Sequence, residues 1–296
     1  MIDHHRIQFE RPDLAQLKQK HTVVDLHFHS HYSDGYNSVE TIAQKVRELG
    51  IGIAITDHNE IRGAIEIAQY RDILSIPGIE MTSAEGTHIL IYFYQLNHLQ
   101  TFYSDHLIPN MGNDIMSSTS LPMEKIIRRA RKFKTVIIFP HPYCGVYTGI
   151  QNSYFSEDRR ERIFSMVDGV EVINSENMKI SNLRSALLGF NLNKSITGGS
   201  DGHKTEHVGQ AVIADPGRGL LEHLGDEVVA RGQDALADEG IGGPEGVVVG
   251  QDGHGLFQGL VHGVLAQIPD HEGVVVDVGQ VVGVGKTLGH DHEGSS

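Results

Sequence analysis

The chain has 296 residues, of which 39% are hydrophobic, and a formal net charge of −14; this length suits one large α/β domain or two smaller ones with a buried core. No run approaches the roughly 20 apolar residues of a membrane span, and the N-terminus lacks the basic-then-apolar order of a signal peptide, which predicts a soluble, cytoplasmic protein. The single cysteine, Cys144, excludes an internal disulfide framework and a multi-cysteine zinc site, and the negative charge argues against non-specific binding of nucleic acid.

Short apolar runs alternate with helical patterns after an N-terminal extension, residues 1–21. In chain order the runs read "TVVDLHF", "IGIAITD", "SIPGIEM", "HILIYFY", "TVIIFP", "GVEVIN" and "SITGGSD". Nearly continuous Ile and Val content of this kind is typical of strands covered on both faces, as in a parallel sheet or barrel. Strands that alternate with helices predict βα units.

Three longer segments have a helical period. Helices are predicted over residues 37–50, 120–134 and 181–190. In the first of them Asn37 can cap the N-terminus, and Gly50 ends the helix. Residues 95–119 show neither the helical period nor the alternation of a strand clearly and are interpreted as an inserted loop.

Side chains that can bind metal ions recur where the apolar runs end, except for one histidine near the start of the fourth run. The nine candidates are His27, His29, Asp34, His58, Glu80, His88, His141, Asp201 and His203. In a parallel βα barrel the C-terminal strand ends converge on one face, so these scattered residues are predicted to form one cluster. Nine ligands are too many for one ion and indicate two or three. Without cysteine, nitrogen and oxygen ligands suit Zn, Mn or Fe, and such clusters can clamp phosphoryl oxygens and acidify a bound water.

Five motifs in this order carry a family resemblance. They are "DLHFHSHYSDG", "ITDHN", "PGIEM", "FPHP" and "GSDGH". Together they resemble the polymerase and histidinol phosphatase (PHP) domain family, over about residues 22–213. The resemblance implies a distorted, TIM-like (β/α)7 barrel, a di- or trinuclear metal centre and hydrolysis of a phosphoester.

The resemblance also implies roles for the nine candidates. It assigns three sets of ligands: His27, His29, Glu80 and Asp201 for one ion; Glu80, His141 and His88 for a second; and Asp34, His58 and His203 for a third. It places Glu80, Asp201 and His203 in the catalytic machinery.

The activity that follows from the resemblance is attack by a metal-activated hydroxide on a phosphate monoester, or on a nucleotide or nucleic-acid phosphate. The expected partner is a small phosphorylated substrate or a nucleotide, with nucleic acid only as a substrate and no membrane. Two alternatives stay open. Amidohydrolase-type metal hydrolases also begin with His-x-His on a barrel strand, and a catalytically inactive, metal-stabilised module could regulate a partner.

Several neighbouring residues are predicted to have other roles. Asp25 and Asp57 are expected to orient ligands rather than bind metal, and His31 is expected to be a loop histidine. Asn174 either contacts substrate or closes a strand. The basic residues 125–134 are interpreted as a solvated helix end, favoured by the helix dipole, rather than as a nucleic-acid patch.

The last part of the chain differs in composition from the rest. Residues 214–296 contain 14 acidic and 3 basic residues, a net charge of −11 out of −14, and 19 of the 34 glycines. Glycine at this density weakens strands and supplies no core. One interpretation is a frameshifted, antisense or fused segment that is disordered, and the other is a genuine Gly/Val-rich β domain. In either case the metal-site candidates all precede it.

Overall fold

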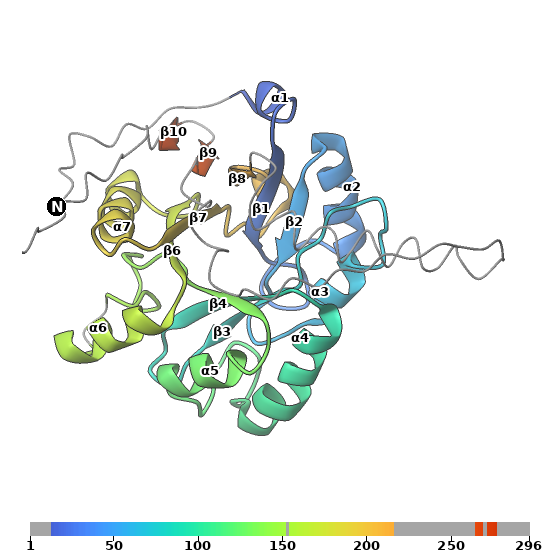
Figure 1. Cartoon of the computed structure of the whole chain (residues 1–296). Coiled ribbons are helices and arrows are strands. Elements are labelled where there is room, and N and C mark those ends of the chain that lie inside the picture. Colours follow the sequence, from blue (N-terminus) through green and yellow to red (C-terminus); the bar gives the residue numbers. More distant parts are fainter. Residues whose placement is uncertain (1–12, 152–153, 216–263, 269–270, 277–296) are drawn as a thin grey trace, which may run out of the picture.

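The computed structural model describes residues 13–151, 154–215, 264–268 and 271–276 (Figure 1). The strands form two five-stranded sheets, in the orders β10-β9-β8-β1-β2 and β3-β4-β5-β6-β7. The strands are β1 (Thr22–Phe28), β2 (Gly52–Ile55), β3 (Gly78–Thr82), β4 (His88–Phe93), β5 (Thr135–Phe139), β6 (Gly169–Asn174), β7 (Ser195–Gly199), β8 (Ala211–Asp215), β9 (Val264–Ile268) and β10 (His271–Val276). The α-helices are α1 (Leu14–Leu17), α2 (Val39–Leu49), α3 (Arg62–Ile67), α4 (Leu96–Phe102), α5 (Met123–Ala130), α6 (Glu157–Met166) and α7 (Lys179–Asn191). In this part of the chain no helix is long and apolar enough to cross a membrane.

The prediction that the seven apolar runs are strands is confirmed by β1 to β7, but their directions are not all parallel. β1 and β2 are parallel, as are β5, β6 and β7. β4 runs antiparallel to both of its neighbours, and β8 runs antiparallel to β1. Ile and Val content reports burial of both faces and carries no information on strand direction, so the sequence could not distinguish these arrangements.

The two sheets meet at two junctions, one between β2 and β3 and one between β1 and β7. At one junction, single bridges join Ile53 to Ser75 and His58 to Glu80. At the other, the backbone N–H of Asp201 donates to the carbonyl of His27 at 2.7 Å. Both junctions place residues of the predicted cluster side by side, so the contacts between the sheets position the site.

Helices lie around the outside of the strands (Figure 1). The amphipathic face of α2 is buried against β1 and β2, and that of α5 packs with residues of β4 and β5. The α2 helix begins one residue later than predicted, because the hydroxyl of Ser38 caps it by accepting from the Thr41 N–H. The Asn37 side chain instead accepts from the Thr205 N–H at 3.0 Å, which ties the loop after β1 to the loop after β7. Gly50 ends the helix in the left-handed conformation, as predicted.

The insertion predicted to be a loop, residues 95–119, is helical in its first half. Helix α4 continues into a π-helical turn, Tyr103–Leu107, and a 3₁₀ turn, Ile108–Asn110. Phe102 and Leu107 are both buried, and their spacing of five residues fits a π-helical turn rather than an α-helix. The change in helix type therefore disrupts the 3.6-residue period on which the prediction depended.

Two segments of the compositionally distinct tail are strands of the first sheet. β8 extends to Asp215, two residues beyond the predicted domain end, and β9 pairs with it antiparallel. β10 in turn pairs antiparallel with β9. The rest of the tail and residues 1–12 of the N-terminal extension lie outside the described residues, so the domain boundaries remain predictions.

A close approach between β7 and β1 generates the first testable prediction. A Cβ atom on Gly199 would lie 2.3 Å from the Cβ of His27, so Gly199→Ala must displace a strand that carries the site. We expect a loss of about 1–3 kcal/mol of folding free energy, as is typical of overpacking, seen as a lower Tm in thermal unfolding. Gly145→Ala is the control, since a Cβ there meets nothing within 4 Å. An equal change in Tm for both variants would contradict this account of the junction.

Candidate metal centre

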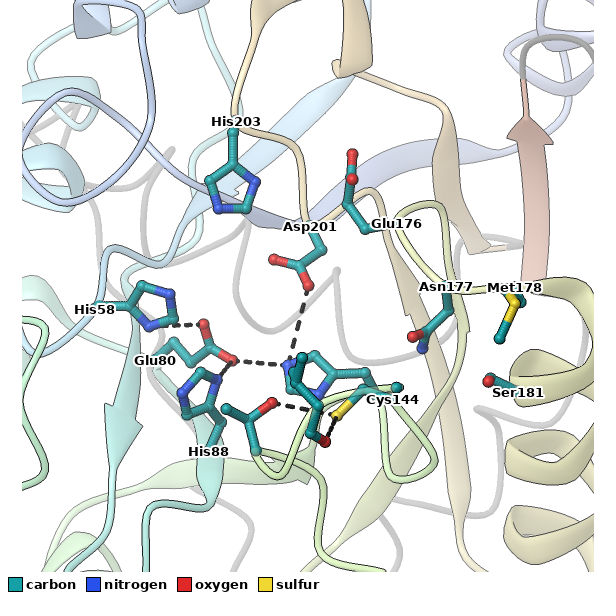
Figure 2. A pocket seen from close by; sticks show the side chains of 14 residues that line it. His58, Glu80, His88, Cys144, Glu176, Asn177, Met178, Ser181, Asp201 and His203 are labelled. Atoms are coloured by element: carbon teal, nitrogen blue, oxygen red, sulfur yellow. Dashed lines mark hydrogen bonds and ion pairs between the residues drawn. The ribbon is translucent and has the colours of Figure 1, made fainter.

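The carboxylate of Glu80, on β3, lies at the centre of a cluster of histidines and is completely buried. Five imidazole nitrogens lie within 3.4 Å of its two oxygens, those of His27, His29, His58, His88 and His141. Figure 2 shows Glu80 between His58 and His88. His88 reaches this position because β4 is antiparallel to β3, with His88 paired to Thr82. Its position at the start of an apolar run is thereby explained.

Donor atoms in this cluster form three groups that share members. Within each group, one atom per residue lies within 4.8 Å of the others. The groups are His27, His29, Glu80 and Asp201; His29, Asp34, His58 and His203; and His58, Glu80 and His88. All nine predicted residues are therefore brought together, with His141 joined through its Nε2 at 3.1 Å from a Glu80 oxygen. Which residues bind which ion remains a prediction.

The tautomer of His27 indicates that a cation is needed. Its Nδ1–H donates to the buried carboxylate of Glu171 at 3.0 Å, so Nε2 is the nitrogen that is left to bind a proton or a metal ion. Nε2 faces oxygens of Glu80 at 3.3 Å and Asp201 at 3.2 Å. Burial lowers the pKa of His27, but Asp201, Glu171 and Glu80 together hold it well above its usual range, so a cation, either a proton or a metal ion, is favoured at this point.

Other buried atoms of the cluster also lack a hydrogen-bond partner among the described residues. Glu80 Oε2 and His58 Nδ1 lie 3.1 Å apart without forming a hydrogen bond, and His29 Nδ1 is unpaired as well. Leaving such atoms unpaired costs about 1–3 kcal/mol each. The donor set and its unpaired atoms therefore fit metal ions better than they fit a self-contained hydrogen-bond network.

The charges of the cluster favour ligation. Burial would raise the pKa of Glu80, but His88, His58 and His27 hold it well below its usual range, so the carboxylate stays ionised. Burial, together with the neighbouring His58, lowers the pKa of His29 to about 4, which keeps this imidazole neutral. An ionised carboxylate and a neutral imidazole are the protonation states that bind metals. Despite burial, the neighbouring carboxylates raise the pKa of His27, His58 and His141, so the binding of ions would release protons from these imidazoles.

Two members of the cluster have backbone conformations that side chains rarely adopt. His141 follows β5 with φ 29°, and Asp201 follows β7 with φ 53°. Each is held there by a hydrogen bond: the His141 N–H donates to Glu171 at 2.9 Å, and the Asp201 N–H donates to the His27 carbonyl. Such conformations cost on the order of 1–3 kcal/mol and gather at functional sites.

Asp25 and Asp57 hold the loops of the site and do not contact the imidazole nitrogens. Asp25 accepts from the backbone N–H groups of Ser200 and Gly209, at 2.9 Å each. Asp57 accepts from the N–H and hydroxyl of Ser30, at 2.7 Å each. His31 is exposed and contacts the ring of Tyr32, outside the cluster.

The sequence analysis missed Glu171, in the middle of β6. Its oxygens accept from His27, from the His141 N–H and from the Asn174 amide. Asn174 also donates to Asp201 at 3.0 Å, so its side chain positions a member of the cluster as well as lying at the end of a strand. An acidic residue inside the apolar run "GVEVIN" was the signal, because an unpaired buried carboxylate would be too costly to retain.

The fold and the site together define a mixed α/β protein with a buried cluster of histidines and carboxylates that is able to hold metal ions. Residues 25–151 match the family model of the PHP domain, and we identify this part of the chain as a PHP domain. An uncharacterised protein of Methanocaldococcus jannaschii is 26% identical over 166 residues, which cover 51% of this chain and 81% of that protein.

Solved structures share the fold. The lesion-specific endonuclease PfuEndoQ of Pyrococcus furiosus matches with a TM-score of 0.52 and 18% identity, over 64% of this chain and 51% of that chain. PsfC of Pseudomonas syringae matches with a TM-score of 0.50 and 15% identity, over 73% of this chain and 99% of that chain. The present chain thus spans about half of the endonuclease, and at these identities the likeness concerns the fold alone.

The contacts of Glu171 generate the second prediction. In Glu171→Gln, one end of the side chain becomes an NH₂ group that faces N–H donors, so His27 and His141 lose their fixed orientation. We expect the affinity for metal to fall about 10- to 100-fold, as for other residues that orient ligands, measured by competition with a chromogenic chelator. Glu161→Gln, on the exposed side of α6, is the matched control and should keep the wild-type affinity. Equal affinities for the two variants would show that Glu171 does not position the ligands.

Proposed function

We propose that this chain is a metal-dependent phosphoesterase, which hydrolyses a phosphate monoester or the phosphate end of a nucleotide or nucleic acid. The observation that carries the proposal is the set of three overlapping donor groups centred on buried Glu80. The PHP domain match over residues 25–151 supports the same chemistry.

The proposed ligand sets follow the family resemblance. Three residues, His29, His58 and Glu80, each belong to two donor groups, which suits ions that share a compact cluster. Glu80 is the proposed bridge, because each of its oxygens faces a different set of imidazoles. A bridging carboxylate offsets the repulsion between two cations that it holds.

We also propose that the two sheets form the distorted (β/α)7 barrel of this family. The backbone contacts at both junctions support it, since β1 adjoins β7 and the end of β2 adjoins β3. The proposed domain begins at residue 22 and ends with β8, two residues beyond the boundary at 213 predicted from the sequence.

The electrostatics of the site explain why ions and phosphate belong together. Glu80, Asp201 and His203 line one cavity, and the pKa of Asp201, despite its burial, is held well below its usual range by His27 and His29. These carboxylates would repel a phosphate dianion unless cations lay between them. When bound, Zn, Mn or Fe ions would supply Lewis acidity to the phosphoryl oxygens and would acidify water.

Individual residues have distinct parts in this proposal. Glu80, which is completely buried, would hold the ions, and Asp201, whose side chain is 15% exposed, would add a second negative charge beside them. His203 is partly exposed at the rim, where its Nε2 lies 3.1 Å from the Asp34 carboxylate. That contact orients the imidazole toward the cavity, in which the reacting phosphate would lie.

The third prediction compares Glu80→Gln with His31→Ala. The amide of glutamine carries no charge to offset two cations, so Glu80→Gln should retain less than half of the wild-type metal and lose at least about 100-fold in kcat on a generic aryl phosphate. His31→Ala should keep both, because His31 lies outside the cluster. We would measure the metal content of each preparation by elemental analysis and its rate of hydrolysis of the aryl phosphate.

The same experiment includes removal of the metal with a chelator and a comparison of the aryl phosphate with amide and lactone substrates. Removing the metal from the wild-type protein should abolish hydrolysis, and returning Zn, Mn or Fe should restore it. Full activity in a metal-free preparation would overturn the mechanism. Turnover of an amide or lactone in place of the aryl phosphate would favour the amidohydrolase alternative, and no turnover of either would favour a regulatory module.

A further inference from the structure

The cavity beside the metal centre has a second wall that is not part of the centre. The cavity has a volume of about 380 Å³. This second wall consists of the loop after β5, the loop between β6 and α7, and the first turn of α7, and Figure 2 shows the second of these loops facing the cluster. The residues concerned are Cys144, Gly145, Val146, Thr148, Glu176, Asn177, Met178 and Ser181.

This wall offers apolar surface and a free amide. Val146 and Met178, one on each loop, are both 67% exposed and both line the cavity, so a ligand that fills the cavity would cover apolar surface on both loops. The Nδ2 atom of Asn177 is buried and has no hydrogen-bond partner among the described residues. A rotation of the Asn177 side chain on ligand binding would bring this amide to a hydrogen-bond acceptor of the ligand and remove that cost.

The charge of the wall is unsuited to a second phosphate. Among the described residues that line the cavity, none is Lys or Arg. The charged residue of the second wall is Glu176, which lies 3.0 Å from His207 and is 45% exposed. A second phosphate there would face the Glu176 carboxylate with no Lys or Arg among the described lining residues to offset it, and a nucleic-acid strand needs several cations along its path.

We propose that this wall receives the uncharged leaving group of a small phosphomonoester that carries a single phosphoryl group. The group has an apolar face for Val146 and Met178 and a hydrogen-bond acceptor for Asn177. A nucleoside has both features, so the substrate class is a nucleoside monophosphate rather than a nucleoside diphosphate or a nucleic-acid end. This assignment rests on the phosphoesterase function proposed above.

The test measures kcat and KM of the metal-loaded protein on four probes: a nucleoside monophosphate, glycerol phosphate, a nucleoside diphosphate and a 5′-phosphorylated single-stranded oligonucleotide. Met178→Ala should lower the ratio of kcat/KM for the nucleoside monophosphate to that for glycerol phosphate about 5- to 20-fold, mainly through KM. Val146→Ala should act in the same direction. Ile180→Ala is the matched control, since Ile180 is 50% exposed on the same segment but does not line the cavity.

A charge reversal tests the exclusion of a second phosphate. Glu176→Lys should raise kcat/KM for the diphosphate, relative to the monophosphate, by about 10-fold, and Glu161→Lys, on exposed α6, should leave the ratio unchanged. This inference alone is overturned if the wild-type protein prefers the oligonucleotide. It is also overturned if Met178→Ala and Ile180→Ala have the same ratio of kcat/KM for the nucleoside monophosphate to kcat/KM for glycerol phosphate. The absence of hydrolysis of every probe overturns the phosphoesterase proposal together with it.

Discussion

The buried charge of Glu80 is the constraint on which the rest of the site depends. A carboxylate removed from water is costly unless it is paired, and here its partners are five imidazoles rather than Lys or Arg. Despite burial, the neighbouring carboxylates raise the pKa of His27, His58 and His141, so protons on these imidazoles balance the buried negative charge when no ion is bound. Metal ions held between the carboxylate and the imidazoles would replace these protons, so the arrangement makes energetic sense as a metal centre.

The same constraint explains the surrounding architecture. Glu171 fixes the His27 tautomer and holds His141 in an unfavourable backbone conformation, and Asn174 connects Glu171 to Asp201. The backbone strain at His141 has a cost in free energy, and the hydrogen bond from its N–H to Glu171 offsets part of that cost. A cluster prepared in this way loses little freedom when ions bind, which is how preorganisation strengthens a site.

The sequence predicted the seven central strands and the nine members of the cluster, because each motif ends an apolar run. It did not predict that β4 is antiparallel, since apolar content does not report direction, and so the place of His88 was unexplained until the pairing with Thr82 was seen. The helical start of the insertion was missed because a π-helical turn breaks the α-helical period. Glu171 was missed because its role depends on contacts with β1 and β5 that lie far away in sequence.

In the proposed function the cavity links this centre to a substrate, since ions on one wall would neutralise a phosphate, and the other wall exposes Val146 and Met178 and has no Lys or Arg among its described residues. The central claim is that Glu80 bridges metal ions, and anomalous X-ray scattering from crystals of metal-loaded protein tests it most directly. We predict at least two anomalous peaks, each within about 2.0–2.3 Å of a Glu80 oxygen, the distance typical of transition-metal carboxylates. A map with no peak at Glu80, or with one ion that contacts neither of its oxygens, would contradict the account.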